Sequence, residues 1–222
     1  MTKKTLSNWE FCSSHTVIGC DEVGAGPIAG PLYACAVSLK DEAHLPLVRD
    51  SKALTAKQRK DALHPILDAA RGWSCRSTLV LGPTILQSRL RLMAACVTDV
   101  VSMIGEEDVI VVVDGDMTIP VSKKLRQTVL IKGDQRCLEV ACASIVAKVL
   151  RDEYMHSLGV KHPEYDFASN AGYATQKHIE AVLRHGVTEH HRPGPTKTAL
   201  TNYTAKKTLS KEQDFNGRRP TS

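Results

Sequence analysis

The chain has 222 residues, which is enough for one ordinary domain, with or without a tail. Its hydrophobic content of 42% suffices for a packed core, and its formal net charge is only +5. The last 22 residues carry a net charge of +3, so the bulk charge of the rest does not by itself indicate a nucleic-acid-binding protein.

No run approaches the ~20 consecutive apolar residues of a membrane span, and no N-terminal segment resembles a signal peptide. The chain has an odd number of cysteines, and no pair of them has C-x-x-C spacing. This usage is typical of reduced, buried thiols. We therefore expect a cytoplasmic protein with no membrane partner.

The first half of the chain predicts two strands, a helix, a third strand and a second helix. The strands are expected at about 16–21 and 31–39, with a turn rich in glycine and proline between them. Thr55 is a good N-cap for the first helix, in which Pro65 is expected to cause a kink or a restart. A strand at 73–81 and a helix opened by Gly82-Pro83 follow.

The second half predicts strands that alternate with helices. The continuous β-branched run 109–113 is typical of a central strand buried on both faces, and a further strand is expected at 128–131. The next helix carries small residues that allow close packing on a sheet, and Thr175 can cap a later helix that Gly186 stops. The order of elements predicts an α/β domain with a mixed sheet flanked by helices.

Acidic residues follow three of the expected strands: Asp21-Glu22, Asp114 and Asp134. In open α/β folds the ligand site lies outside the strand ends. Acids that converge there without a histidine nearby in sequence would form an all-oxygen site, which suits Mg²⁺ or Mn²⁺. Four carboxylates can hold two such ions for phosphodiester hydrolysis. The alternative is that these acids form a charged hairpin turn or cap turns after strands.

Five motifs, in order, resemble those of the ribonuclease HII family between about residues 16 and 200. They are Asp21-Glu22-Val23-Gly24-Ala25-Gly26-Pro27, Asp50-Ser51-Lys52, Val113-Asp114-Gly115 with Lys132-Gly133-Asp134, the run 143–152, and Gly172-Tyr173-Ala174-Thr175 with His178. The resemblance implies an RNase H-like fold with a small helical C-terminal extension. It also implies metal-dependent endonuclease action on RNA in RNA–DNA hybrids and at ribonucleotides embedded in duplex DNA.

The polar composition after about residue 200 predicts a disordered basic tail over 201–222. The resemblance implies a catalytic domain over residues 1–200, with its helical part from about 158. It also assigns the metal-binding, catalytic carboxylates: Asp21, Glu22, Asp114 and Asp134. Asp152 competes with Asp134 for the fourth place, because it lies on the helix stripe that faces the body. The family favours Asp134 and leaves Asp152 as a structural acid, paired with a neighbouring lysine or arginine.

The same resemblance implies substrate contacts by Gly24, Ala25, Gly26, Ser51, Lys52, Ser144, Lys148 and Tyr173. Ala25 departs from the arginine that the family usually has in this 2′-hydroxyl-recognising loop, and Glu189–Pro195 departs from its Ser-Phe pattern. Without the family, Ser51 would be a helix cap, Lys52 a solvated lysine and Tyr173 a core residue. Irregular spacing argues against a zinc site at His185, His190 and His191.

The sequence leaves more than one functional class open. A monomeric ribonuclease that acts on hybrids and ribonucleotide-containing duplexes is favoured, because all four carboxylates are present. The alternatives are a hybrid- or DNA-binding protein of the same fold with weakened catalysis, or another two-metal nuclease.

Overall fold

The computed structural model describes residues 15–41, 43–48, 51–79, 84–105 and 108–216, with side chains as far as residue 208. The chain forms two compact units. The first holds the chain up to Ala25 and Pro31–Glu153, and the second holds Gly26–Gly30 and the chain from Tyr154 onward. The second unit therefore starts slightly before residue 158 and includes a loop from the N-terminal part of the sequence.

The first unit is built on a mixed sheet with the order β3-β2-β1-β4-β5. The strands are β1 (Thr16–Val23), β2 (Leu32–Leu39), β3 (Ala70–Thr78), β4 (Val109–Asp114) and β5 (Arg126–Leu130). β2 pairs antiparallel with β1 and β3, whereas β4 runs parallel to β1 and β5. The predicted mixed sheet is confirmed, and the parallel strands β1, β4 and β5 end at the same edge.

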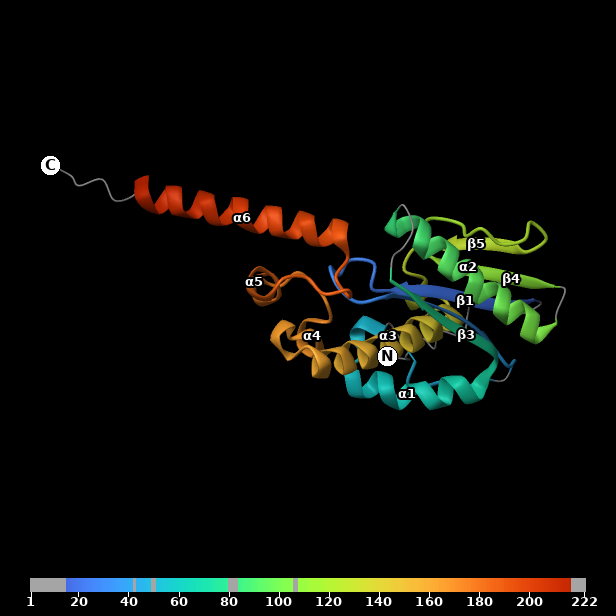
Figure 1. Ribbon diagram of the computed structural model, residues 1–222. Coiled ribbons are helices and arrows are strands. Elements are labelled where there is room, and N and C mark those ends of the chain that lie inside the picture. Colours follow the sequence, from blue (N-terminus) through green and yellow to red (C-terminus); the bar gives the residue numbers. More distant parts are fainter. Residues whose placement is uncertain (1–14, 42, 49–50, 80–83, 106–107, 217–222) are drawn as a thin grey trace. The chain divides into compact units, whose positions relative to one another are not determined.

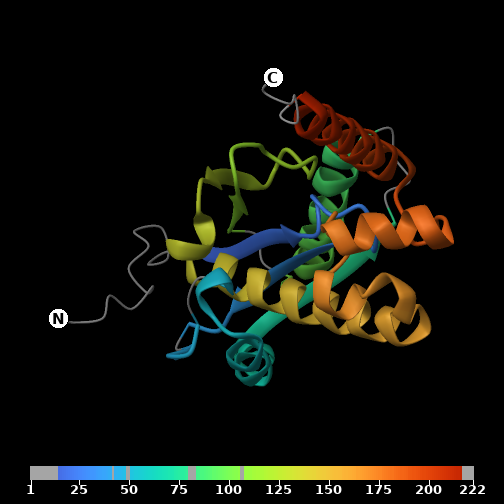
Figure 2. The same cartoon turned by 90° about the vertical axis from the view of Figure 1, so that its left-hand side faces the viewer.

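The β-branched run of β4 is buried along its length, as predicted for a central strand. On one face of β4, α2 (Ile85–Ile104) packs on Val109, Val111 and Val113. On the other face, a second buried cluster contains Ile110, Val112 and Val140. Figures 1 and 2 show α2 on one face of the sheet and α1 (Ala56–Ala69) and α3 (Leu138–Lys161) on the other. Both faces of the sheet are therefore covered within this unit.

α3 approaches the sheet so closely that β1 needs a glycine beneath it. A Cβ on Gly19 would lie 2.2 Å from the backbone carbon of Glu139 and the backbone nitrogen of Val140. The small residues Ala143 and Ala147 of α3 are fully buried. The predicted close packing of this helix on the sheet is confirmed, and it brings the side chains of α3 next to the ends of β1 and β4.

The helix starts agree with the capping signals in the sequence. Thr55 caps α1 in a capping box with Gln58, and Thr84 caps α2. Of the kink or restart expected at Pro65, the restart does not occur, because α1 is one helix through this residue. Burial of Ala62 and Ile66 on either side of the proline stabilises that turn despite the lost hydrogen bond. The expected strand end near residue 81 and the Gly82-Pro83 helix start lie outside the described residues, as do Cys12 and Asp50.

The second unit contains the end of α3, the short segments η3 (Pro163–Tyr165) and α4 (Phe167–Asn170), α5 (Gln176–His185) and α6 (Pro193–Asn216). Thr175 caps α5, and Gly186, with a φ of 85°, follows its last residue. These features were predicted from the sequence. Tyr165 and Phe167 stack with their ring centroids 5.3 Å apart and anchor a small core with Met155 and Val182.

α6 extends to Asn216, so residues 201–216 of the segment that was expected to be a disordered basic tail are helical. The segment has no apolar periodicity, but it contains good helix formers and no glycine or proline before Gly217. The hydroxyls of Thr204 and Thr208 bond the carbonyls four residues earlier. Residues 217–222 lie outside the described part of the chain. Among the described helices, none has the length and hydropathy that crossing a membrane requires.

Candidate active site

The parallel pairing of β1 with β4 brings the first three predicted acids to one edge of the sheet. Cys20 pairs with Val113, so Asp21 and Glu22 follow on β1 where Asp114 ends β4. Asp114 accepts a 2.6 Å hydrogen bond from the amide of Gly133. This bond fastens the turn that carries the fourth acid, in the segment η2 (Gly133–Gln135), to the end of β4.

Asp21 lies at the centre of this group and is only 6% exposed. Burial raises the pKa of its carboxyl well above the ordinary value, and repulsion from Glu22 and Asp114 raises it further. Hydrogen bonds from the Ser144 hydroxyl and from the Glu22 amide, at 2.7 Å, oppose this shift. Asp21 is thus a buried acid whose neighbours repel its charge, and a bound cation would stabilise it.

Glu22 shares this environment but has a cation beside it. Burial raises the pKa of its carboxyl, and the guanidinium of Arg89, 3.3 Å away on α2, opposes the increase. Arg89 was not singled out from the sequence. It occupies a polar position between apolar residues of a helix, and only the packing of α2 on the sheet brings it to the acids.

Asp134 and Asp152, which competed for the fourth place, differ in their partners. Asp134 is 4% exposed and forms a 3.7 Å ion pair with Lys52, whose side chain is 85% exposed. Asp152 pairs with Lys148 one turn earlier on α3 and with Arg59 of α1 at 3.6 Å. The expected pairing of Asp152 with neighbouring basic residues is confirmed.

The donor chemistry of this edge fits a hard divalent cation. The acids offer only oxygen atoms, and burial is the main cause of the raised pKa values of Asp21 and Glu22, so a bound cation would stabilise their charged forms. Within the described residues, however, no set of three or more histidine, cysteine, aspartate or glutamate side chains is already gathered at metal-binding spacing. Ion binding would therefore have to draw the carboxylates inward.

Two serines connect the acids to the expected phosphate-binding motif. The hydroxyls of Ser51 and Ser144 are 2.8 Å apart, and Ser144 also bonds Asp21. Thr55, not Ser51, caps α1, so the helix-cap alternative for Ser51 is wrong. The Lys52 side chain is 85% exposed and lies 3.7 Å from Asp134, whereas Lys148 is paired with Asp152.

The predicted glycine loop begins at a position that only glycine can occupy. Gly24 has a φ of 91°, and a Cβ there would lie 2.2 Å from the guanidinium of Arg151. Arg151 is fully buried and donates a 3.1 Å hydrogen bond to the Pro31 carbonyl. Ala25 is half-buried and Gly26 is exposed. The contact between Arg151 and this loop was not predicted from the sequence, because more than a hundred residues separate them.

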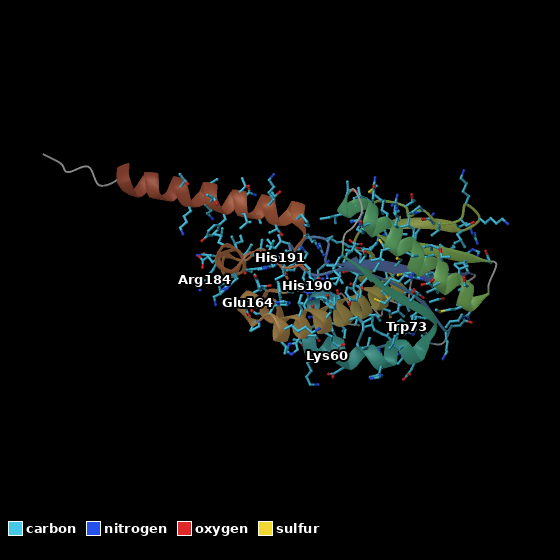
Figure 3. The ribbon with its side chains drawn as sticks, viewed as in Figure 1. Lys60, Trp73, Glu164, Arg184, His190 and His191 are labelled. Carbon is cyan, nitrogen blue, oxygen red and sulfur yellow. The ribbon has the colours of Figure 1, made fainter. Side chains whose placement is uncertain are left out.

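In the second unit, Tyr173 is 50% exposed, so the alternative of a core tyrosine is wrong. His190 and His191 lie in the loop before α6 (Figure 3). Both ring nitrogens of His191 have hydrogen-bond partners, from Thr188 and His178. Nδ1 of His190 is buried with no hydrogen-bond partner among the described residues.

The family model described as Ribonuclease HII matches residues 18–202. Ribonuclease HII of Desulfotalea psychrophila is 39% identical, with 79% of this chain and 78% of the relative aligned. The Salinibacter ruber protein of the same name is 40% identical over 79% of this chain and 88% of its own.

The fold matches solved structures as well. The structure of the PCNA:RNase HII complex from Archaeoglobus fulgidus aligns with a TM-score of 0.63 and 26% identity, over 80% of this chain and 93% of that chain. Bst-RNase HIII in complex with Mn²⁺ aligns with a TM-score of 0.66 at 19% identity, over 86% and 71% of the two chains, which is a likeness of fold alone. The sequence match over most of the chain, together with the acids at the sheet edge, establishes that this chain belongs to the ribonuclease HII family.

Proposed function

We propose that this chain is a metal-dependent endoribonuclease that cleaves RNA in RNA–DNA hybrids and beside ribonucleotides embedded in duplex DNA. The observation that carries the proposal is the edge where Asp21, Glu22 and Asp114 meet, because burial and mutual repulsion raise the pKa of two of these acids. Membership of the family supports the same reaction class.

Four carboxylates would hold the divalent ions: Asp21, Glu22, Asp114 and Asp134. Bound there, two ions of Mg²⁺ or Mn²⁺ supply an activated water and stabilise the leaving oxygen of an in-line displacement. Asp21 and Asp134 are the most buried of the four, and Arg89 limits the repulsion at Glu22. The Ser144 hydroxyl orients Asp21, and Ser144 is held in turn by Ser51.

Several residues would contact the substrate. Lys52 would bind a backbone phosphate through its exposed ammonium group, since phosphate contacts position a nucleic acid without reading its sequence. The backbone of Gly24–Gly26 would contact the 2′-hydroxyl, which distinguishes RNA from DNA. The exposed ring of Tyr173 would pack on the neighbouring sugar. Lys148 would add positive charge only if it leaves Asp152.

A cytoplasmic monomer is the form that we propose for the enzyme. The second candidate function, a hybrid-binding protein with weakened catalysis, follows from Ala25, where the family has an arginine. The deciding experiment incubates the purified chain and Mn²⁺ or Mg²⁺ with a DNA duplex that contains one ribonucleotide. Cleavage at the ribonucleotide, with an all-DNA duplex left intact, supports the enzyme. Binding without cleavage in either metal would favour the second candidate.

A further inference from the structure

The loop Gly26–Gly30 in the second unit is held by backbone hydrogen bonds on both sides. The amides of Ile28 and Ala29 donate to the Gly172 carbonyl at 2.9 and 3.2 Å. On the other side, Gly30 donates to the His190 carbonyl at 2.9 Å, and the Arg192 amide donates to the Ile28 carbonyl at 2.7 Å. The loop thus lies between the segment that contains Tyr173 and the segment 188–192, which we call the clasp.

The side chain of Arg192 reinforces this arrangement. It is 4% exposed, and its Nε and Nη2 atoms donate to the Gly30 carbonyl at 2.9 and 2.7 Å. Its Nη1 atom donates to the Pro27 carbonyl at 3.1 Å. One planar guanidinium therefore fixes two peptide groups of the loop, a geometry that the single ammonium of a lysine does not reproduce.

His191 extends the clasp to Tyr173 through a second histidine. The Thr188 amide donates to His191 Nδ1 at 3.0 Å, so the proton of the neutral ring lies on Nε2. His191 Nε2 then donates to His178 Nε2 at 3.1 Å, and His178 Nδ1 donates to the Tyr173 carbonyl at 2.8 Å. Each ring nitrogen of this pair has a hydrogen-bond partner, and the protons are consistent along the whole chain of bonds.

The two segments that the clasp joins are in tight contact, which leaves little room for adjustment. A Cβ added to Gly172, whose φ is 82°, would lie 2.2 Å from the Ala29 carbonyl oxygen. A small displacement of either backbone would therefore disturb the other. Gly26 and Tyr173 belong to these segments, and a Cβ on Gly26 would lie 3.6 Å from the Tyr173 ring.

We propose that Arg192 and His191 are positioning residues for ribonucleotide recognition, because they fix the Gly26–Gly30 loop and the Gly172–Tyr173 backbone in one arrangement. This inference rests on the proposed function, in which Gly26 and Tyr173 contact the substrate. Neither positioning residue is placed against the substrate or the metal ions. Loosening the clasp lowers the preference for a ribonucleotide, whereas the carboxylates of the first unit keep their chemistry.

The test replaces Arg192 by lysine, which keeps the positive charge but removes the planar guanidinium that bonds two carbonyl groups. The matched control is Arg184→Lys, an exposed arginine on α5 (Figure 3). Affinity is measured in EDTA for a duplex with one ribonucleotide and for the same duplex made only of DNA, and kcat and KM are measured with Mn²⁺. We expect Arg192→Lys to lower the ratio of the two affinities about tenfold, roughly the effect of one or two hydrogen bonds. KM should rise while kcat stays within about threefold, and Arg184→Lys should match the wild type.

A second pair of variants tests the clasp at His191, which is neutral. His191→Leu deletes the hydrogen bond to His178, and His191→Gln places an amide donor near the Nε2 position. The preference should fall in the leucine variant and recover in the glutamine variant, with His156→Leu, an exposed histidine of α3, as the control.

The inference is overturned if Arg192→Lys folds with an unchanged preference, or if His191→Leu and His191→Gln lose the preference equally. It is also overturned if either positioning variant lowers kcat with no change in KM or in the affinity ratio. Failure of the proposed function is a separate result, because the wild-type chain would then neither cleave nor prefer the ribonucleotide duplex.

Discussion

Two groups of buried titratable side chains lie in this chain, and they are stabilised in different ways. At the sheet edge of the first unit, Asp21, Glu22 and Asp114 repel one another, and burial raises the pKa of the first two. In the second unit, His178 and His191 are also buried, but every ring nitrogen has a hydrogen-bond partner. Burial lowers the pKa of both histidines, that of His191 to about 4, so the pair is neutral at physiological pH.

The difference shows why a cluster of titratable residues is not by itself a site for an ion. The acids carry charge that the protein compensates only in part, through Arg89 and Lys52. The histidines carry no charge and have no ring nitrogen left to offer to a metal. The hydrogen bonds and ion pairs of each group thus distinguish the acids, which need a cation, from the histidines, which serve only to hold backbone segments together.

The largest expected effect comes from Asp21→Asn, which keeps the shape and removes one charge from the acid group. Cleavage of a ribonucleotide-containing duplex should fall at least about 10³-fold, as after loss of a central catalytic group. Affinity for the hybrid should be unchanged or higher, because phosphate repulsion falls. The midpoint temperature of thermal unfolding without metal should also rise by about 2 °C or more, because the substitution removes a buried charge that its neighbours repel. Full activity at saturating metal would refute the role of Asp21.

A comparison of Asp134→Asn with Asp152→Asn sharpens the assignment of the fourth carboxylate. The first change removes a proposed metal ligand, and activity should fall about 10²-fold or more. The second breaks only the pairing with Lys148 and Arg59. We expect activity within about fivefold of the wild type and a loss of roughly 1 kcal/mol in the free energy of unfolding. The assignment is wrong if the two activities are reversed.

Ala25→Arg should strengthen nucleic-acid binding by restoring the residue that the family usually has. A charge-assisted hydrogen bond contributes about 1.5–3 kcal/mol, so affinity should rise roughly ten- to a hundredfold. The ratio of cleavage between ribonucleotide and all-DNA duplexes should change little, because the flanking glycines supply the backbone contacts. Kinetics on both duplexes measure this. A neutral or harmful result would mean that the loop makes a different contact here.

Acid should weaken the fold through the histidine cluster of the second unit. Because the folded-state pKa of His191, about 4, lies below its ordinary value of 6.5, the unfolded chain binds the proton more tightly. The contribution of His191 to the free energy of unfolding is therefore fully present above about pH 6.5. It is lost as the pH falls toward 4, by at most about 3 kcal/mol. Denaturant unfolding between pH 4 and 7.5 measures this loss, and His191→Gln should make it smaller. An equal loss of stability between pH 7.5 and pH 4 in His191→Gln would show that His191 does not cause this pH dependence.

The smallest effect is expected from deletion of residues 205–222. Residues 205–208 are exposed on α6, so the free energy of unfolding should change by less than about 1 kcal/mol. Duplex binding should weaken a few-fold at low salt and hardly at all at high salt, because the lysines and arginines act through phosphates. A large loss of thermal stability would show that the segment packs against the protein.

Local signals in the sequence predicted the strands that end in acids, the helix caps Thr55 and Thr175, and the buried β4 run. These features depend on residues close together in the chain. The roles of Arg89, Arg151 and Arg192 could not be predicted in this way. Each arginine reaches its partners across tens to more than a hundred residues, so only the folded arrangement shows what it holds. The length of α6 was missed because helix propensity without an apolar face gives a weak signal.

Calorimetric titration of MnCl₂ into the wild type, Asp21→Asn and His191→Gln, without nucleic acid, tests most directly whether the acids and not the histidines form the cation site. We predict that binding is lost or at least about tenfold weaker in Asp21→Asn, because a ligand charge is removed. His191→Gln should bind Mn²⁺ like the wild type. Unchanged binding in Asp21→Asn, or its loss in His191→Gln, would contradict the account.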